Sequence, residues 1–303
     1  MIKKQKILQI TVSLLFCISI ASCKEISDGR DKQMNEEDIT TLRTSQNPEA
    51  LCQAALEIAN GNNPDGLRLL AQKLGNNEFL SILDSEKDYQ SSPYTLNVTG
   101  VLETLAENPA PPAKEILTQL TQNSVFLANL SRLEMLILAC ANIRPVPEPV
   151  LKFWTQQTGP ESSSTPLVVE ALFTNGTEPA MKFFENLMNN PSYSDSDKIF
   201  WLRTYAVPHR DDLYFLEAAE RAIRGNAENQ TKFEWIRTIF DYKAGWYPPR
   251  DIPVPPDPLL IQPQSKEKLL STGNNALSLP DLPEDLKLAI ERRLKMYNQK
   301  ENQ

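Results

Sequence analysis

The spacing of apolar residues constrains the fold of this chain more than any other feature. From about residue 47 onward, apolar side chains recur at positions i, i+3, i+4 and i+7, which places them on one face of an α-helix. The alternation that predicts β-strands is hard to find anywhere. The sets with helical spacing are Leu51/Ala54/Ala55/Ile58, Leu67/Leu70/Ala71/Leu74, Leu133/Leu136/Ile137/Cys140, Ala180/Phe183/Phe184/Leu187 and Phe215/Ala218/Ala219/Ala222. The sequence therefore predicts an all-α fold.

The order of the turn residues predicts that the helices come in pairs. Turn signals recur about every 32 to 45 residues, the length of two short helices and their loops. The stretch Thr165–Asn190 shows one pair, in which a helix, an Asn-Gly turn and a proline-started helix follow one another. This pattern resembles HEAT-type or tetratricopeptide-type repeats. We therefore expect an irregular α-solenoid over residues 47–244, with a non-repeating helical bundle as the alternative.

Composition excludes several function classes. The 303 residues have a formal net charge of −8, with 10 glycines, 23 prolines and one histidine. An acidic chain is a poor nucleic-acid binder, because counterion displacement needs concentrated Lys and Arg. A single histidine excludes multi-histidine metal sites, and the few glycines argue against a glycine-rich cofactor fold. We expect no cofactor, no metal and no nucleic-acid partner.

The first 23 residues have the pattern of an export signal. Three lysines among the first six residues precede an apolar stretch from Ile7 to Ala21, which is shorter than the ~20 residues needed to span a bilayer. The stretch ends in Ile20-Ala21-Ser22-Cys23. Those four residues resemble the lipobox of bacterial lipoproteins, in which small residues precede a cysteine.

The resemblance implies that signal peptidase II removes residues 1–22 and that Cys23 carries a diacylglyceryl group and an N-acyl chain. Several acyl chains give a firm membrane anchor. Lys24 follows the cysteine, in place of the aspartate that retains some lipoproteins at the inner membrane. The expected location is therefore the bacterial cell envelope, with the outer membrane favoured over the extracytoplasmic face of the inner membrane. An ordinary cleaved signal with an incidental cysteine is the alternative.

Three further segments complete the predicted organisation. Residues 23–46 are polar and are expected to form a flexible, lipidated tether. Residues 245–282 begin with a proline-rich run and are expected to be extended, as a strap over the helical body, with a proline-rich peptide ligand as the alternative. Residues 283–303 are expected to form a last helix and tail, with Arg292, Arg293 and Lys295 complementing the negative end of its dipole.

Candidate reactive groups are few. Cys52 and Cys140 lie on or beside apolar stripes, which favours buried thiols over a mutual disulfide. His209 precedes Asp211 and Asp212, with which it could form an acid–base couple. Capping of the next helix by one of the two aspartates, with His209 in solvent, is the favoured interpretation. No catalytic residue is assigned.

Aromatic residues are concentrated in the second half of the chain. The tryptophans are Trp154, Trp201, Trp235 and Trp246. Rings exposed on the concave side of a solenoid would serve as binding anchors, whereas core packing is the default interpretation. We therefore expect a non-catalytic protein-binding or scaffold module with an envelope protein as partner. The alternatives are an envelope hydrolase acting on polymer or peptide, and a carrier of a small ligand or lipid.

Overall fold

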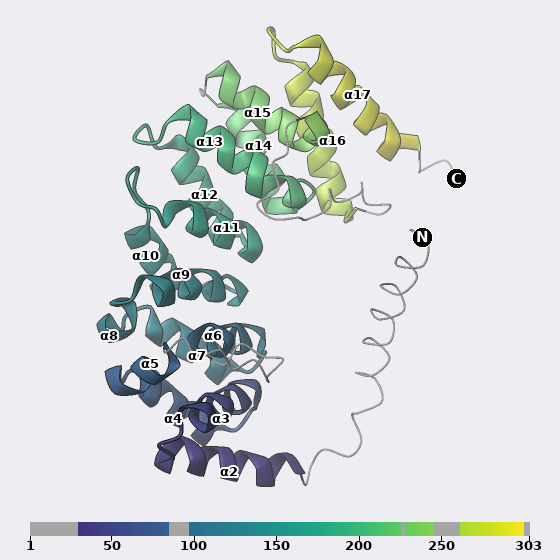
Figure 1. The fold of residues 1–303 in the computed structure, drawn as a ribbon. Coiled ribbons are helices and arrows are strands. Elements are labelled where there is room, and N and C mark those ends of the chain that lie inside the picture. The colour runs from purple at the N-terminus through teal and green to yellow at the C-terminus, as the bar shows by residue number, and fades with distance from the viewer. Residues whose placement is uncertain (1–29, 85–96, 226–227, 245–260, 300–303) are drawn as a thin grey trace, which may run out of the picture. The chain divides into compact units, whose positions relative to one another are not determined.

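The computed structural model describes residues 30–84, 97–225, 228–244 and 261–299, and within these ranges it contains helices and no strand (Figure 1). The all-α prediction is confirmed. The chain forms two compact units, Met1–Ile116 and Leu117–Gln303, which divide the predicted single repeat domain. The helix α7 (Pro111–Leu120) contains the boundary.

The first unit is organised around one central helix. Its helices are α2 (Arg30–Thr44), α3 (Pro48–Asn60), α4 (Pro64–Leu74), α5 (Asn77–Leu83), α6 (Val98–Glu107) and the beginning of α7. Helix α3 packs against α2, α4, α5 and α6. The four helices α3 to α6 begin at asparagines whose side chains accept first-turn N–H groups, namely Asn47, Asn63, Asn76 and Asn97. These caps satisfy donors that a helix start leaves without partners.

A second use of asparagine joins the ends of two helices in this unit. Asn108, which follows α6, is buried, and its Nδ2 donates to the carbonyl oxygens of Ala59 at 2.7 Å and Gly61 at 2.9 Å. Both carbonyls lie at the carboxyl end of α3, where the last turn of a helix has no internal donors left. The side chain of Asn108 therefore fixes how α6 lies against α3.

The predicted flexible tether is wrong for its second half. Residues 30–44 form helix α2, which packs against α3 and α4. Ile39 and Leu42, three positions apart, are 8% and 0% exposed. The segment is polar overall, but two large side chains on one helix face bury enough apolar surface to order it. Residues 1–29, which contain the expected signal and Cys23, lie outside the described residues.

We predict that Leu42→Ala lowers the free energy of unfolding of the first unit by about 2–5 kcal/mol, the usual cost of removing a fully buried leucine side chain. The mutant should also be cleaved faster by proteases between residues 30 and 47. Arg43→Ala, on the exposed side of the same helix turn, is the matched control. Equal urea-unfolding curves and equal cleavage rates for the two variants would show that α2 is not docked.

The second unit contains the remaining helices. They are α8 (Ser124–Leu127), α9 (Leu130–Ala139), η1 (Cys140–Asn142), α10 (Glu148–Gln157), α11 (Thr165–Asn175), α12 (Glu178–Asn189), α13 (Asp195–Trp201), η2 (Leu202–Ala206), η3 (Val207–His209), α14 (Leu213–Arg224), α15 (Asn229–Phe240), η4 (Tyr242–Ala244), α16 (Pro263–Leu277) and α17 (Glu284–Gln299). The predicted helix pair in Thr165–Asn190 is confirmed as α11 and α12. Gly176 ends α11 with φ 64°, a left-handed conformation that favours glycine.

The helices of the second unit form two chains of contacts. In one, α9 contacts α11, α11 contacts η2, η2 contacts α15, and α15 contacts α17. In the other, α12 contacts α14, and α14 contacts α16. Alternate helices thus pack on one another within this unit. The arrangement of the body as a solenoid stays a prediction.

The predicted extended segment 245–282 is wrong for residues 263–277, which form helix α16. Pro263 is its first residue, a position where proline costs no hydrogen bond. Helix α16 packs against α14 and α17, which lie beside it in Figure 1. A Cβ atom on Gly273 would lie 2.8 Å from Leu294 Cδ2, so a larger residue here would force the end of the Leu294 side chain on α17 to move. Residues 245–260 lie outside the described residues.

The last predicted helix is confirmed as α17, with one correction. Leu286, Ala289, Ile290 and Leu294 are buried, as their spacing indicates. Arg293, however, is 4% exposed and reaches into the unit, where it donates to the Ile239 carbonyl and to Asp211. Its charge is therefore compensated by a carboxylate on η3–α14 and not by the dipole of its own helix.

Candidate functional site

A cavity of about 570 Å³ lies in the second unit, where the ends of several helices meet. Its walls come from the loop after η1, the end of α11, the η3–α14 junction and the start of α16. The lining residues are Arg144, Phe173, Thr174, Asn175, Gly176, His209, Asp211, Asp212, Leu213, Tyr214, Ile261, Gln262, Gln264 and Ser265. Segments separated by more than a hundred residues thus share one site.

The first wall is fixed by Asn175, the last residue of α11. Its buried Nδ2 donates to the carbonyl oxygens of Ala141 at 3.0 Å and Ile143 at 2.9 Å. Arg144, the residue after Ile143, donates from Nη2 to the Thr174 carbonyl at 2.6 Å. The side chain of Asn175 and that of Arg144 therefore tie the loop and the helix end together from both sides. This use of asparagine repeats that of Asn108 in the first unit.

The wall formed by the η3–α14 junction carries the only histidine of the chain. The ring of His209 stacks on Phe173, with centroids 5.6 Å apart and planes at 28°, and its Nδ1 lies 2.8 Å from Asp212 Oδ2. The His209 side chain is 29% exposed. The ring is thus partly in solvent, but Phe173 and Asp212 hold it in place. The geometry is that of the histidine–aspartate couple, the less favoured interpretation.

The aspartates do not cap α14 as predicted. Asp212 occupies the N-cap position, but its side chain makes no capping hydrogen bond. Asp211 Oδ1 accepts from Arg293 Nη2 at 2.6 Å, and its Oδ2 lies 3.8 Å from Arg210 Nε. Arg210 is 1% exposed and lies over the Tyr242 ring. Buried cations need a counter-charge, and this need outweighs the capping preference of aspartate.

The rings behind the cavity form a continuous column. Trp235 stacks on Phe215 at 5.2 Å, Phe215 meets Phe173 edge-on at 5.7 Å, and Phe173 carries His209. These rings come from α15, α14, α11 and η3. The position of His209 is thus set by the core and not by its loop alone.

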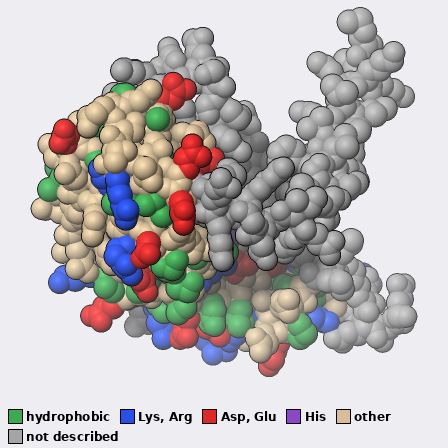
Figure 2. All heavy atoms as spheres, turned by 90° about the horizontal axis from the view of Figure 1, so that it is seen from below, with side chains coloured by type: hydrophobic (Ala, Val, Ile, Leu, Met, Phe, Trp, Pro, Cys, Tyr) green, Lys and Arg blue, Asp and Glu red, His purple; other side chains and the backbone are tan. Residues whose placement is uncertain are grey.

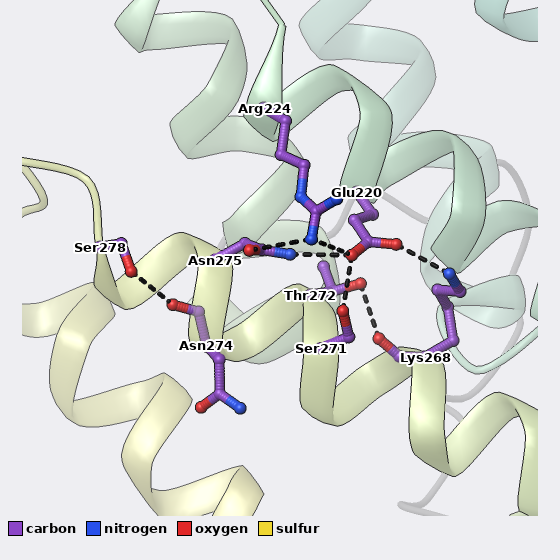
Figure 3. Close-up of polar contacts among 8 residues, drawn as sticks. All are labelled: Glu220, Arg224, Lys268, Ser271, Thr272, Asn274, Asn275 and Ser278. Atoms are coloured by element: carbon purple, nitrogen blue, oxygen red, sulfur yellow. Dashed lines mark hydrogen bonds and ion pairs between the residues drawn. The ribbon is translucent and has the colours of Figure 1, made fainter.

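The start of α16 forms another wall of the cavity, and its position depends on a buried carboxylate that joins α14 to α16. Glu220 accepts hydrogen bonds from Lys268 at 2.8 Å, Ser271 at 2.6 Å and Asn275 at 2.8 Å, all from α16, and lies 3.0 Å from Arg224 (Figure 3). Burial alone would raise the pKa of Glu220, but the bonds from Lys268 and Ser271 and the nearby cations hold this pKa below its ordinary value. The charged carboxylate therefore stabilises the contact that places the start of α16 at the cavity.

We predict that Glu220→Gln lowers the free energy of unfolding of the second unit at pH 7 by about 1–3 kcal/mol, because it removes charge-assisted hydrogen bonds. A lowered pKa in the folded state means that this stabilisation is present above pH 4.5 and is lost as the pH falls through the folded pKa. Urea unfolding at pH 7 and pH 4 should therefore show a mutant deficit that shrinks in acid. Glu217→Gln, on the same helix, is the control. A deficit that is equal at both pH values would contradict the role of the charge.

Three of the four tryptophans proposed as binding anchors are core residues. Trp154, Trp201 and Trp235 are 0%, 3% and 1% exposed. Trp154 Nε1 donates to the Ile137 carbonyl at 3.3 Å, and Trp201 meets Tyr193 edge-on. For these three the binding-anchor interpretation is wrong and core packing is right, because indole rings fill the space between successive helices. Trp246 lies outside the described residues.

Both body cysteines are buried and neither forms a disulfide. They lie in different units, Cys52 on α3 and Cys140 at the end of α9. Burial and then the charge of Glu49 raise the pKa of the Cys52 thiol to about 11. This thiol stays protonated near neutral pH and is a poor nucleophile.

Within the described ranges, no group of three His, Cys, Asp or Glu side chains is placed to hold a metal ion, and no helix combines the length and the apolar character needed to cross a membrane. Figure 2 shows one face of the molecule, on which the coloured acidic and basic side chains lie among one another. Comparison of the chain with models of protein families, with curated proteins and with solved structures finds no match.

Sequence reasoning missed Arg144, Asn175 and Ser265 as site residues. The sequence indicates only a turn at Asn175, and it indicates no role for Arg144. Their role depends on contacts across 30 or more residues. Ser265 was hidden in the segment predicted to be extended.

Proposed function

We propose that the chain is a lipid-anchored protein of the bacterial envelope whose helical body binds a protein partner without catalysing a reaction. The basic first segment, the apolar stretch and Ile20–Cys23 support the anchor. In this proposal Cys23 carries the lipid, and Lys24 favours the outer membrane.

The observation that carries partner binding is the composition of the cavity. Four segments of one unit contribute to it, and its lining combines polar groups such as Gln262 and Gln264 with apolar ones such as Leu213 and Tyr214. A cavity of about 570 Å³ is large enough for a few residues of another chain. A mixed lining suits a peptide segment, which presents amide groups and side chains together.

The helix contacts support an irregular solenoid as the framework. Alternate helices of the second unit pack on one another, and the same asparagine device occurs at Asn108 and Asn175 in the two units. Stacked helix pairs present extended surfaces for partners. The inference from fold to function is by analogy, and the cavity supplies the specific site.

One observation favours the hydrolase alternative, namely the His209–Asp212 couple in the cavity wall. A base of this kind needs a nucleophile or a water held next to it. Among the described residues, no Ser, Thr or Cys side chain is hydrogen-bonded to His209. The lipid-carrier alternative needs an apolar cavity, and Arg144, His209, Asp211 and Asp212 make this one polar.

The anchor is tested by Cys23→Ala. We predict that the variant carries no acyl mass and remains as uncut precursor that keeps its signal. Cys17→Ala, which changes a cysteine inside the apolar stretch, should be processed as the wild type. A Cys23→Ala protein that matures and fractionates with membranes as before would refute the lipid anchor.

Partner binding is tested in cells with a photo-crosslinking residue at Gln264, an exposed residue of the cavity wall, or at Asn186, an exposed residue of α12. We predict that one envelope protein is captured in stoichiometric amount from position 264 and not from position 186. Tyr214→Ala, which removes a cavity wall, should abolish the capture. Equal capture at both positions, or none at 264, would refute the proposal.

A further inference from the structure

Helix α17 carries apolar side chains on the face that points away from its own unit. Leu288 is 53% exposed and Met296 is 40% exposed, whereas Leu286, Ile290 and Leu294 are buried. Helix α17 packs against α15 and α16 and lies at the outer end of the second unit in Figure 1. The last helix of a stacked array normally has a polar outer face. The exposed apolar side chains depart from this rule, and a further helix packed on them would account for them.

The other exposed side chains of this face are charged. At 100° per residue, the positions within about 60° of Leu288 are Glu284, Asp285, Glu291, Arg292 and Lys295, with Lys287 at the edge of the face. The three acids and the three bases cancel, although the whole chain has a formal net charge of −8. A second copy of an acidic protein meets no net repulsion at a neutral face.

The order of these charges fits a second copy of the same helix that runs in the opposite direction. In a two-fold antiparallel pair, two residues face each other when the midpoint of their numbers lies at the symmetry axis. The pairs of opposite charge are Asp285–Arg292, Lys287–Glu291 and Glu284–Lys295, and their midpoints are positions 288.5, 289 and 289.5. A single register therefore places every charge of the face opposite its complement.

The pairing also holds from one side of the face to the other. A two-fold axis between antiparallel helices brings each side of the face against the same side of the second copy. Asp285 and Arg292 both lie to one side of Leu288, at about 60° and 40° around the helix. The members of the other two pairs all lie to the opposite side. No pair has to cross the apolar centre to form.

The same register brings the exposed apolar side chains together. Leu288 lies one residue from the axis and meets Leu288 of the second copy. Met296 faces position 282, which is the half-buried Leu282 just before the helix. Apolar contact at the centre supplies the favourable free energy, whereas exposed charge pairs mainly fix register and orientation.

The ion pairs that these carboxylates make within one chain are long and exposed. Glu284 Oε2 lies 3.8 Å from Lys287 Nζ, and Asp285 Oδ2 lies 3.7 Å from Arg237 Nη2. Exposed pairs of this kind contribute little to stability. They can therefore be exchanged for pairs with a second copy at little cost.

We propose that the outer face of α17 is a self-association surface, on which two copies of this chain pair their α17 helices antiparallel about an axis next to Leu288. One helix from each copy makes a small interface, so the dimer is weak and reversible. This surface is separate from the cavity, and the proposal depends neither on the lipid anchor nor on a foreign partner.

Sedimentation velocity of the full chain, in detergent with micelles in excess over protein, measures the dissociation constant of the dimer. We expect a concentration-dependent dimer with a dissociation constant of about 10–100 μM. Leu288→Ala should weaken it by about tenfold, because each dimer loses two central side chains. Leu130→Ala changes a leucine of α9 that is 60% exposed, and this matched control should leave the dissociation constant unchanged.

Charge reversal tests the antiparallel register. One variant carries Glu284→Lys with Asp285→Lys, and the other carries Arg292→Glu with Lys295→Glu. Each variant alone should dimerise about tenfold more weakly, because like charges then face each other. An equimolar mixture of the two should dimerise as the wild type does, because every pair again has opposite signs. Glu178→Lys, at an exposed position of α12, is the control for an added charge.

A wild-type chain that stays monomeric up to about 500 μM would overturn the proposal. So would a dimer that Leu288→Ala leaves unchanged, or two reversal variants that fold as the wild type does but do not associate when mixed. Thermal unfolding of each variant separates lost association from lost structure. Recovery in the mixture shows in addition that both reversal variants are folded.

Discussion

The burial of apolar helix faces against other helices is the constraint on which the rest of this structure depends. With no strand in the described ranges, each stripe must find its cover on a helix nearby in sequence. The aromatic column from Trp235 through Phe215 to Phe173 shows the result in the second unit. One end of that column is covered by His209 at the cavity. The site is thus the place where the core reaches the surface.

Helix packing alone leaves the carbonyls at helix ends without donors, and the protein meets this need with asparagine. Asn108 and Asn175 each donate to two carbonyls two residues apart, at the end of a helix that precedes them by 30 to 50 residues. Each side chain thereby holds two helix ends of its unit at a fixed position relative to each other. In the second unit this link also fixes the loop that carries Arg144. The geometry of the cavity therefore depends on a side chain that donates to otherwise unsatisfied carbonyls at a helix end.

The sequence allowed the helices to be predicted because their signals are local. Apolar spacing, glycines at helix ends and prolines in first turns gave α3, α4, α12 and α17 with their buried faces. Helix α2 was missed because, among its residues whose burial is described, only Ile39 and Leu42 are buried, and their partners lie on other helices. Helix α16 was missed because the extended conformation expected of the proline-rich run was assumed to continue beyond Pro263.

The candidate site was less accessible to sequence reasoning, because its chemistry depends on long-range pairing. Asp211 and Asp212 look like capping residues, and only the buried Arg293, 82 positions away, shows why Asp211 does not act as one. His209 was recognised as a possible partner of Asp212, but its exposure depends on Phe173. Nothing local distinguishes the Trp rings of a core from those of a binding surface.

The docking of α2 has a mechanical consequence for the proposed membrane anchor. On the proposed anchor, only seven peptide units separate Cys23 from the first residue of α2, so the distance between these two residues is at most about 25 Å. A long flexible tether would extend under a pulling force, at a cost in its conformational entropy, before the force reached the folded unit. On that anchor, a pull would be transmitted into the Ile39 and Leu42 contacts and would act along the α2–α3 interface. Helix α2 would then be the mechanical coupling between the bilayer and the first unit.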